Sequence, residues 1–539
     1  MKTLKHLLLP ALCALTLASC SDDETKEPAE EPLDERAILF AEPGSPSLDS
    51  GKGSFRFGAA TAASQIEDQN TAVDWYHWSL PRDEGGLGVG TFVGDASMGF
   101  SKAEQDAQLI ADLGLDAYRF SIEWARIEPQ RDQIDEAALD HYDRFIDALV
   151  ARGITPMITL HHFSNPLWVD NFLTDCPDDM PSDEDLCGWD HPEGSQLILE
   201  EIQEHAALLA ERYGDRVDEW CTVNEPINYL VASYLLAVFP PGKALLLDLL
   251  EAFVPVVRNY IDAHVRMYDA IKANDTGDAD GDGQEASVGF SLSVIKFVPA
   301  QDNQPSDDVE AIAATERIEY VYHHIFTESI LQGAFDADLD QTFEEAQPQW
   351  EGKLDWLGVQ YYFRTGISAT PILPVINAAP CFGGFDNGSC VPALDDSKIV
   401  PDMGYEYFEE GLHEILVDFG QRWPDLPLMV TETGIATHVG ARRAEQTVRS
   451  LEQIARAIED GVDVRGYYHW SLMDNFEWAE GYEPRFGLYR VDFETYERTP
   501  TEGADALKEI TRRRAIPGAM QDQYGGTGPM TPEAAPEGE

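Results

Sequence analysis

The chain has 539 residues, enough for one large domain or several smaller ones. Hydrophobic residues make up 43% and aromatic residues 10% of it, so it can bury a substantial core and global disorder is excluded. With 98 acidic against 37 basic residues, the formal net charge is −61, which disfavours binding to nucleic acid and to anionic membrane surfaces. A solvated acidic coat is the simplest interpretation, and recruitment of cations or of a basic partner is the alternative.

Residues 1–19 have the pattern of an export signal. Two lysines precede an apolar run, Leu7–Leu17, that is too short to span a bilayer as a helix. The run ends in LASC, which resembles a bacterial lipobox with Cys20 as the lipidated residue; an ordinary cleaved signal peptide is the alternative. Residues 20–50 start acidic and proline-rich and predict a disordered tether. We therefore expect an exported lipoprotein of the outer membrane that contacts the membrane only through its lipid.

A short β-rich segment followed by a longer amphipathic stretch recurs eight times along the chain. Several of the short segments are nearly continuous apolar runs, typical of parallel strands buried on both faces. Eight such units predict one (β/α)8 TIM barrel over residues 51–515; two doubly wound halves are the alternative, but no GxGxxG follows a strand. Residues 516–539, rich in Gly, Pro, Thr and Glu, predict a disordered tail. The predicted strands span 55–62, 117–124, 155–163, 219–226, 286–295, 354–362, 427–435 and 464–472.

Five cysteines remain once the export signal and Cys20 are set aside. An exported protein can form disulfides. Cys176 and Cys187 bracket one polar insertion, and Cys381 and Cys390 bracket another, so two local disulfides are the economical pairing. The fifth cysteine, at position 221, lies in an apolar stretch and is expected to be a buried free thiol.

An acidic loop precedes the fifth predicted strand. Its sequence, DADGDG, places Asp278, Asp280 and Asp282 at alternate positions before a glycine, as in the first half of a calcium-binding loop. The bidentate glutamate expected at position twelve is missing, because Gly289 stands there. A structural calcium site and a solvated acidic turn are therefore both open.

Chemistry in a barrel enzyme is concentrated at the carboxyl ends of the strands. Here those ends carry carboxylates, amides, imidazoles and aromatic rings, without the pattern of a metal cage or phosphate loop. Cleavage of a glycosidic bond requires such a set, because one carboxyl group protonates the leaving oxygen while the other attacks the anomeric carbon. The residues are Gln65, Glu67, Arg119, Glu123, His161, His162, Asn224, Glu225, Tyr361, Tyr362, Glu432 and Trp470.

Six motifs, in order and at workable spacings, resemble those of glycoside hydrolase family 1, the β-glucosidase family. The resemblance extends from about residue 53 to residue 514. The motifs are FRFGAATAASQIE (55–67), YRFSIEWARI (118–127), TLHHFSNP (159–166), TVNEP (222–226), LMVTETG (428–434) and WSLMDNFEWAEGYEPRFGLYRVDF (470–493).

The resemblance implies a retaining exo-β-glycosidase, most closely a β-glucosidase, that acts on β-glucosides or short β-linked saccharides without a cofactor. Glu225 would be the general acid/base and Glu432 the nucleophile, with carboxyl groups roughly 5–5.5 Å apart. Arg119 and Tyr362 would hydrogen-bond Glu432 and keep it ionised. A glutamate at position 477 disfavours phosphorylated sugars. The positions implied to bind the sugar are Gln65, His162, Asn224, Trp470, Glu477 and Trp478.

Three positions depart from the usual family pattern. Thr433 stands where Asn is usual, Gln360 replaces Asn before the tyrosine pair, and Ile227 replaces Trp after the NEP triplet. The last change puts contacts to the aglycone in doubt. A surface lipoprotein that binds sugar without turnover is an alternative function, but retention of both carboxylates disfavours it. An enzyme in which transglycosylation outweighs hydrolysis is a third.

Overall fold

The computed structural model describes residues 32–174, 176, 180–373, 375–381 and 387–533. Cys20 and the export signal predicted over residues 1–19 lie outside the described residues. No helix in the described part of the chain has the length and apolar character needed to cross a bilayer.

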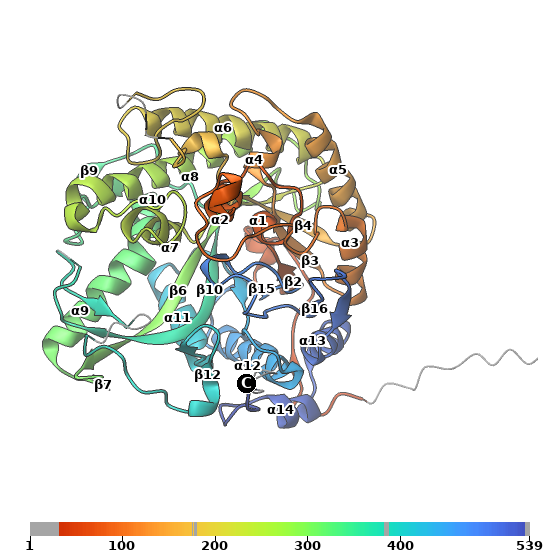
Figure 1. Cartoon of the computed structure of the whole chain (residues 1–539). Helices are drawn as coiled ribbons and strands as arrows, with labels where there is room; N and C mark the ends of the chain where they lie inside the picture. The colour runs from red at the N-terminus through yellow and green to blue at the C-terminus, as the bar shows by residue number, and fades with distance from the viewer. Residues whose placement is uncertain (1–31, 175, 177–179, 374, 382–386, 534–539) are drawn as a thin grey trace, which may run out of the picture.

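Eight parallel strands form a closed barrel at the centre of the molecule (Figure 1). Successive strands pair side by side, and the last pairs in parallel with the first, placing Trp470 opposite Ala60. The ring is complete, which confirms the (β/α)8 barrel and excludes two doubly wound halves. The strands are β2 (Arg56–Ala60), β3 (Ala117–Ser121), β4 (Thr155–His161), β5 (Glu219–Asn224), β6 (Ser287–Gln301), β10 (Trp356–Ser368), β14 (Leu428–Thr433) and β15 (Val464–Trp470).

Helices surround the barrel and cover the outer faces of its strands (Figure 1). Helix α5, for example, begins after Asp135, whose carboxylate accepts hydrogen bonds from the amides of Ala137 and Ala138 and so caps the helix. The long helices are α3 (Ala103–Asp112), α5 (Glu136–Val150), α6 (Gly194–Tyr213), α8 (Val254–Asn274), α9 (Val309–Glu319), α10 (Ile325–Gln332), α11 (Glu409–Arg422), α12 (Gly440–Glu459) and α13 (Glu502–Arg513).

Short elements connect and close the ends of the barrel. The short helices are α1 (Ala63–Ile66), α2 (Asp74–Ser79), α4 (Trp124–Ile127), α7 (Pro226–Leu230) and α14 (Gly518–Tyr524). The short strands are β1 (Ile38–Leu39), β7 (Gln304–Pro305), β8 (Ala334–Phe335), β9 (Glu345–Ala346), β11 (Ala379–Pro380), β12 (Ile399–Val400), β13 (Tyr405–Glu406), β16 (Tyr489–Val491), β17 (Arg498–Pro500) and β18 (Ala515–Ile516).

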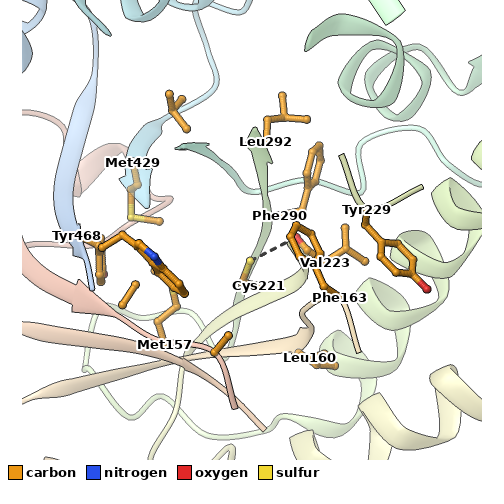
Figure 2. Close-up of a cluster of buried hydrophobic side chains, with 14 of the residues drawn as sticks. Met157, Leu160, Phe163, Cys221, Val223, Tyr229, Phe290, Leu292, Met429 and Tyr468 are labelled. Atoms are coloured by element: carbon orange, nitrogen blue, oxygen red, sulfur yellow. Dashed lines mark hydrogen bonds between the residues drawn. The ribbon is translucent and has the colours of Figure 1, made fainter. Parts of the chain in front are cut away.

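Buried side chains from several strands form the core. Figure 2 shows Met157, Cys221, Met429 and Tyr468, which come from four different strands and are all buried. The Tyr468 ring needs the space left by Gly58, because a Cβ atom at position 58 would lie 2.4 Å from that ring. Close packing of this kind makes the barrel a rigid support for the side chains at its rim.

Both predicted disulfides are present. Cys176 is bonded to Cys187 with their Cα atoms 5.6 Å apart, and Cys381 is bonded to Cys390 with a Cα separation of 4.8 Å. Cys221 is buried and unpaired, as expected. Each disulfide closes a short loop outside the repeating βα units.

The C-terminal segment is ordered, so the disordered tail predicted over 516–539 is wrong for residues 516–533. After α14, Met530 is buried with only 3% of its surface exposed. We call residues 525–533 the C-terminal strap. The guanidinium group of Arg449 donates to the carbonyl oxygens of Gly528 at 2.7 Å and Pro529 at 3.1 Å. Buried guanidinium groups need acceptors, and the strap supplies them although its composition is polar and proline-rich.

The strap also reaches the segment that follows β14. One carboxylate oxygen of Glu533 accepts a hydrogen bond from the Thr437 hydroxyl at 2.5 Å, and the other accepts one from the His438 amide at 3.0 Å. Residues 534–539 lie outside the described residues.

The N-terminal boundary of the domain also differs from the prediction. Strand β1 pairs antiparallel with β18, and Phe40 is buried against Phe55 and Phe57. The tether predicted over 20–50 is therefore wrong from Ile38 onward, because apolar residues there extend the core. Residues 20–31 lie outside the described residues.

Candidate active site

Glu225 lies directly after β5, where the chain turns into α7. Its backbone has φ 44° and ψ 59°, a left-handed conformation that is costly for a residue with a side chain. Its amide donates to the Ser291 carbonyl oxygen at 2.8 Å, and its own carbonyl oxygen accepts from the Tyr229 amide at 2.9 Å. Pro226 occupies the first position of α7, which suits its fixed φ. The turn thus fixes the direction in which the Glu225 side chain leaves the strand.

Glu432 lies near the end of β14 and is held by two donors from other strands. Arg119 of β3 donates from Nη1 to Oε1 at 2.5 Å, and the Tyr362 hydroxyl of β10 donates to Oε2 at 2.8 Å. Glu432 is 4% exposed and Arg119 is fully buried. Both oxygens of this carboxylate are therefore oriented by the barrel itself.

The two carboxyl groups interact electrostatically but have different partners. Burial raises the pKa of Glu225 to about 8, and the nearby charge of Glu432 adds to this. Burial also raises the pKa of Glu432, but the Arg119 guanidinium and the Tyr362 hydroxyl oppose that shift. Glu432 has the cationic partner and so carries the negative charge more readily, whereas Glu225 holds its proton near neutral pH.

Asn224 is oriented by the same guanidinium group that holds Glu432. Its Oδ1 atom accepts from Arg119 Nη2 at 2.6 Å and from Gln360 Nε2 at 2.7 Å. Because Oδ1 already accepts two hydrogen bonds, the NH2 group of the same amide points away from Arg119 and Gln360. Gln360, noted in the sequence as a departure from the usual Asn, therefore fixes the Asn224 amide.

Thr433, the other departure next to Glu432, is fully buried. Its hydroxyl accepts a hydrogen bond from Gln446 Nε2 of α12 at 3.1 Å. This contact ties the end of β14 to the helix that follows it, and it leaves the Glu432 carboxylate untouched.

Gln65, His162 and Glu477 lie around the same end of the barrel. Gln65 Nε2 contacts the Phe476 carbonyl oxygen at 2.8 Å and Glu477 Oε2 at 3.4 Å. Gln65 Oε1 and His162 Nδ1 are buried and have no hydrogen-bond partner among the described residues. Buried polar atoms without partners are costly, so these two atoms are suited to bind a ligand.

Three aromatic rings extend this group of polar atoms. The His162 ring stacks near Trp470, with ring centroids 5.9 Å apart, and near Trp478, at 6.0 Å. Trp75 packs against Trp478, with ring centroids 4.9 Å apart.

Burial and the charge of Glu432 raise the pKa of Glu477 to about 8, although hydrogen bonds from Trp470 and Gln65 act to lower it. Most of the predicted sugar-binding residues thus contact one another, and the charge of Glu432 reaches Glu477.

Sequence reasoning missed two residues that act on Glu225. Asn228 Nδ2 donates to Glu225 Oε2 at 2.7 Å, and the Tyr322 hydroxyl donates to Asn228 Oδ1 at 3.0 Å. Asn228 could have been found, because it lies one helical turn after Glu225. No motif marks Tyr322.

The acidic loop lies apart from these groups, before β6. Three aspartates in or near the loop each place one carboxylate oxygen within 4.8 Å of the other two: Asp218, Asp278 and Asp280. Asp282 is not part of this group. Asp280 Oδ1 accepts the Asp282 amide at 2.9 Å, and Asp282 Oδ1 accepts the Gln284 amide at 2.8 Å. These bonds are those of an acidic turn, and a calcium site here stays a prediction.

Comparison with known proteins agrees with the geometry. The chain is 30% identical over 518 residues to a β-galactosidase of Pyrococcus woesei, covering 87% of this chain and 98% of that protein. It is 31% identical to a β-glucosidase of Agrobacterium sp., covering 83% and 92%. The solved structure of a β-glycosidase from Pyrococcus horikoshii has a TM-score of 0.72 and 29% identity, covering 90% of this chain and 99% of that one.

A sequence model described as glycosyl hydrolase family 1 matches residues 49–516, which include all eight barrel strands and both carboxyl groups. Such a match over most of the chain is decisive. The chain belongs to glycosyl hydrolase family 1.

Proposed function

We propose that this protein is a retaining exo-β-glycosidase, most closely a β-glucosidase, with Glu432 as nucleophile and Glu225 as general acid/base. The observation that carries the proposal is the contrast between two buried, interacting carboxyl groups. Glu432 accepts from a guanidinium group and a phenol, whereas Glu225 has its pKa raised to about 8. One group is thus prepared to attack and the other to donate a proton.

The reaction follows in two balanced steps. Glu432 attacks the anomeric carbon while Glu225 gives its proton to the leaving oxygen, which produces a glycosyl ester at Glu432 and a free alcohol. Glu225, now ionised, takes a proton from water as that water attacks the anomeric carbon. The ester bond breaks, the sugar leaves with retained configuration, and Glu225 is protonated again. Neither step needs a cofactor.

The glycone would be bound by the polar atoms around the carboxyl pair. Gln65 Oε1 and His162 Nδ1, which have no partner within the described part of the chain, would accept from sugar hydroxyl groups. The NH2 group of Asn224 would donate to the 2-hydroxyl, a contact that strengthens in the transition state. Trp470 and Trp478 would contact the ring, and the protonated carboxyl of Glu477 can both donate and accept.

A neutral sugar suits this site better than a phosphorylated one. The negative charge of Glu432 would repel a bound phosphate, and Glu477 offers a carboxyl group in place of the cationic side chain that a phosphate favours. Glucosides are the proposed main substrates, with galactosides and fucosides as side substrates. Relatives named β-glucosidase, β-galactosidase and bifunctional β-D-glucosidase/β-D-fucosidase support this range.

Hydrolysis of nitrophenyl β-glucoside tests the proposal. We expect Glu432→Ala to abolish release of nitrophenol, while Glu225→Ala should retain activity only on substrates with good leaving groups. Added azide should restore turnover of Glu225→Ala and give the β-glycosyl azide, since it attacks from the face that water uses. A product of inverted configuration from the wild-type enzyme would refute the mechanism, and unchanged activity in both variants would refute the assignment.

We also propose that the protein is exported and anchored by lipid at Cys20. Support comes from the signal-like residues 1–19 and from the two disulfides, which fit an oxidising compartment. Metabolic labelling with radioactive palmitate should mark the wild-type protein, processed to begin at Cys20, but not a Cys20→Ser variant. An unlabelled wild-type chain recovered without its first residues would instead indicate an ordinary signal peptide.

A further inference from the structure

Helix α7 places an amide donor one turn after Glu225. Asn228 Nδ2 lies 2.7 Å from Glu225 Oε2. Both residues belong to the same short segment, so this hydrogen bond is local in sequence. An N–H group that donates to Oε2 favours the form of the carboxyl group in which Oε2 carries no proton. The proton of the neutral acid is therefore directed to the other oxygen, Oε1.

Tyr322 fixes which end of the Asn228 amide faces Glu225. Its hydroxyl donates to Asn228 Oδ1 at 3.0 Å, so the NH2 group is turned toward the carboxyl group. Tyr322 comes from the helical turn Tyr320–His324, between α9 and α10. The orientation of the amide thus depends on a part of the chain remote in sequence.

We propose that Asn228, oriented by Tyr322, is a positioning residue that holds the proton of Glu225 on Oε1 and stabilises the ionised form of its carboxyl group. This inference rests on the proposed role of Glu225. The other groups that act on Glu225 are Glu432, whose charge raises its pKa, Arg119, which lowers it, and Ser293, which hydrogen-bonds it. Tyr322 and Tyr362 also lie within electrostatic range of Glu225, and burial raises the pKa of both.

The first test is the pH profile of kcat/KM for Asn228→Leu, which keeps the branched shape of the side chain but removes the donor. The donor favours the ionised carboxylate, so its loss should raise the pKa of Glu225 and shift the basic limb upward by about one pH unit. Tyr322→Phe should shift the same limb by less, because the amide stays but is no longer oriented. Tyr320→Phe, in the same turn but bonded to Asp336, is the matched control and should leave the limb in place.

A second measurement distinguishes a loss of proton positioning at Glu225 from a general loss of active-site structure. Substrates with good leaving groups need little protonation, so Asn228→Leu should slow dinitrophenyl glucoside hydrolysis much less than hydrolysis of an alkyl glucoside or cellobiose. Equal losses on all substrates, or an unmoved basic limb in both Asn228→Leu and Tyr322→Phe, would overturn the inference. Should Glu225→Ala keep full activity on alkyl glucosides, the proposed function itself would fail, which is a separate outcome.

Discussion

The hydrogen bond from Tyr362 to Glu432 gives a direct test of how the nucleophile is kept ionised. Tyr362→Phe removes only the hydroxyl that lies 2.8 Å from Oε2. A hydrogen bond to a charged group stabilises it by roughly 1.5–3 kcal/mol, which corresponds to about one to two pKa units. Because this bond favours the carboxylate, its loss should raise the pKa of Glu432.

The expected consequence is an upward shift of the acidic limb of the kcat/KM profile by at least about one pH unit. Activity should therefore fall most at low pH, where Glu432 becomes protonated, and recover partly as the pH rises. The assay is release of nitrophenol from an aryl β-glucoside across the pH range, with thermal unfolding as a check that the barrel is intact. The reasoning would be refuted if the variant folds normally and only its basic limb moves.

Three further predictions concern other parts of the molecule. Glu477→Ala should lower kcat/KM for glucosides at least about tenfold, because a group that can donate to and accept from sugar hydroxyls is lost; activity on aryl glucosides and galactosides measures this. Loss of the disulfide in Cys381→Ser should lower the free energy of unfolding by about 2.5 kcal/mol in urea denaturation, with little change in kcat. Deletion of residues 525–539 should lower that free energy by at least about 3 kcal/mol, since Arg449 loses two carbonyl acceptors. Deletion of 534–539 alone is the control, and equal stability of the two truncated proteins would contradict the role given to the strap.

Much of the fold could be predicted because the barrel strands carry a strong local signal. Nearly continuous apolar runs alternate with amphipathic segments, which predicts a parallel sheet, and the eight repeats favour a closed barrel. Glu225 and Glu432 could be singled out because each stands at a strand end within a recognisable motif. The disulfides followed from cysteines that bracket short polar insertions.

Contacts between distant segments could not be predicted in the same way. Tyr322 lies 94 residues beyond Asn228, and nothing in its own neighbourhood indicates that it orients the amide. The strap was missed for a related reason, because its composition is typical of disorder. The strap is ordered because buried guanidinium groups on α12 need its carbonyl oxygens as hydrogen-bond acceptors.

The C-terminal strap bears on how this enzyme should be produced. A gene shortened at the boundary of the family match, residue 516, would still encode every barrel strand and both carboxyl groups. It would nevertheless leave Thr437 without the carboxylate that its hydroxyl contacts. Poor yield or early inactivation of such a product would then reflect the choice of stop codon and not the quality of the catalyst.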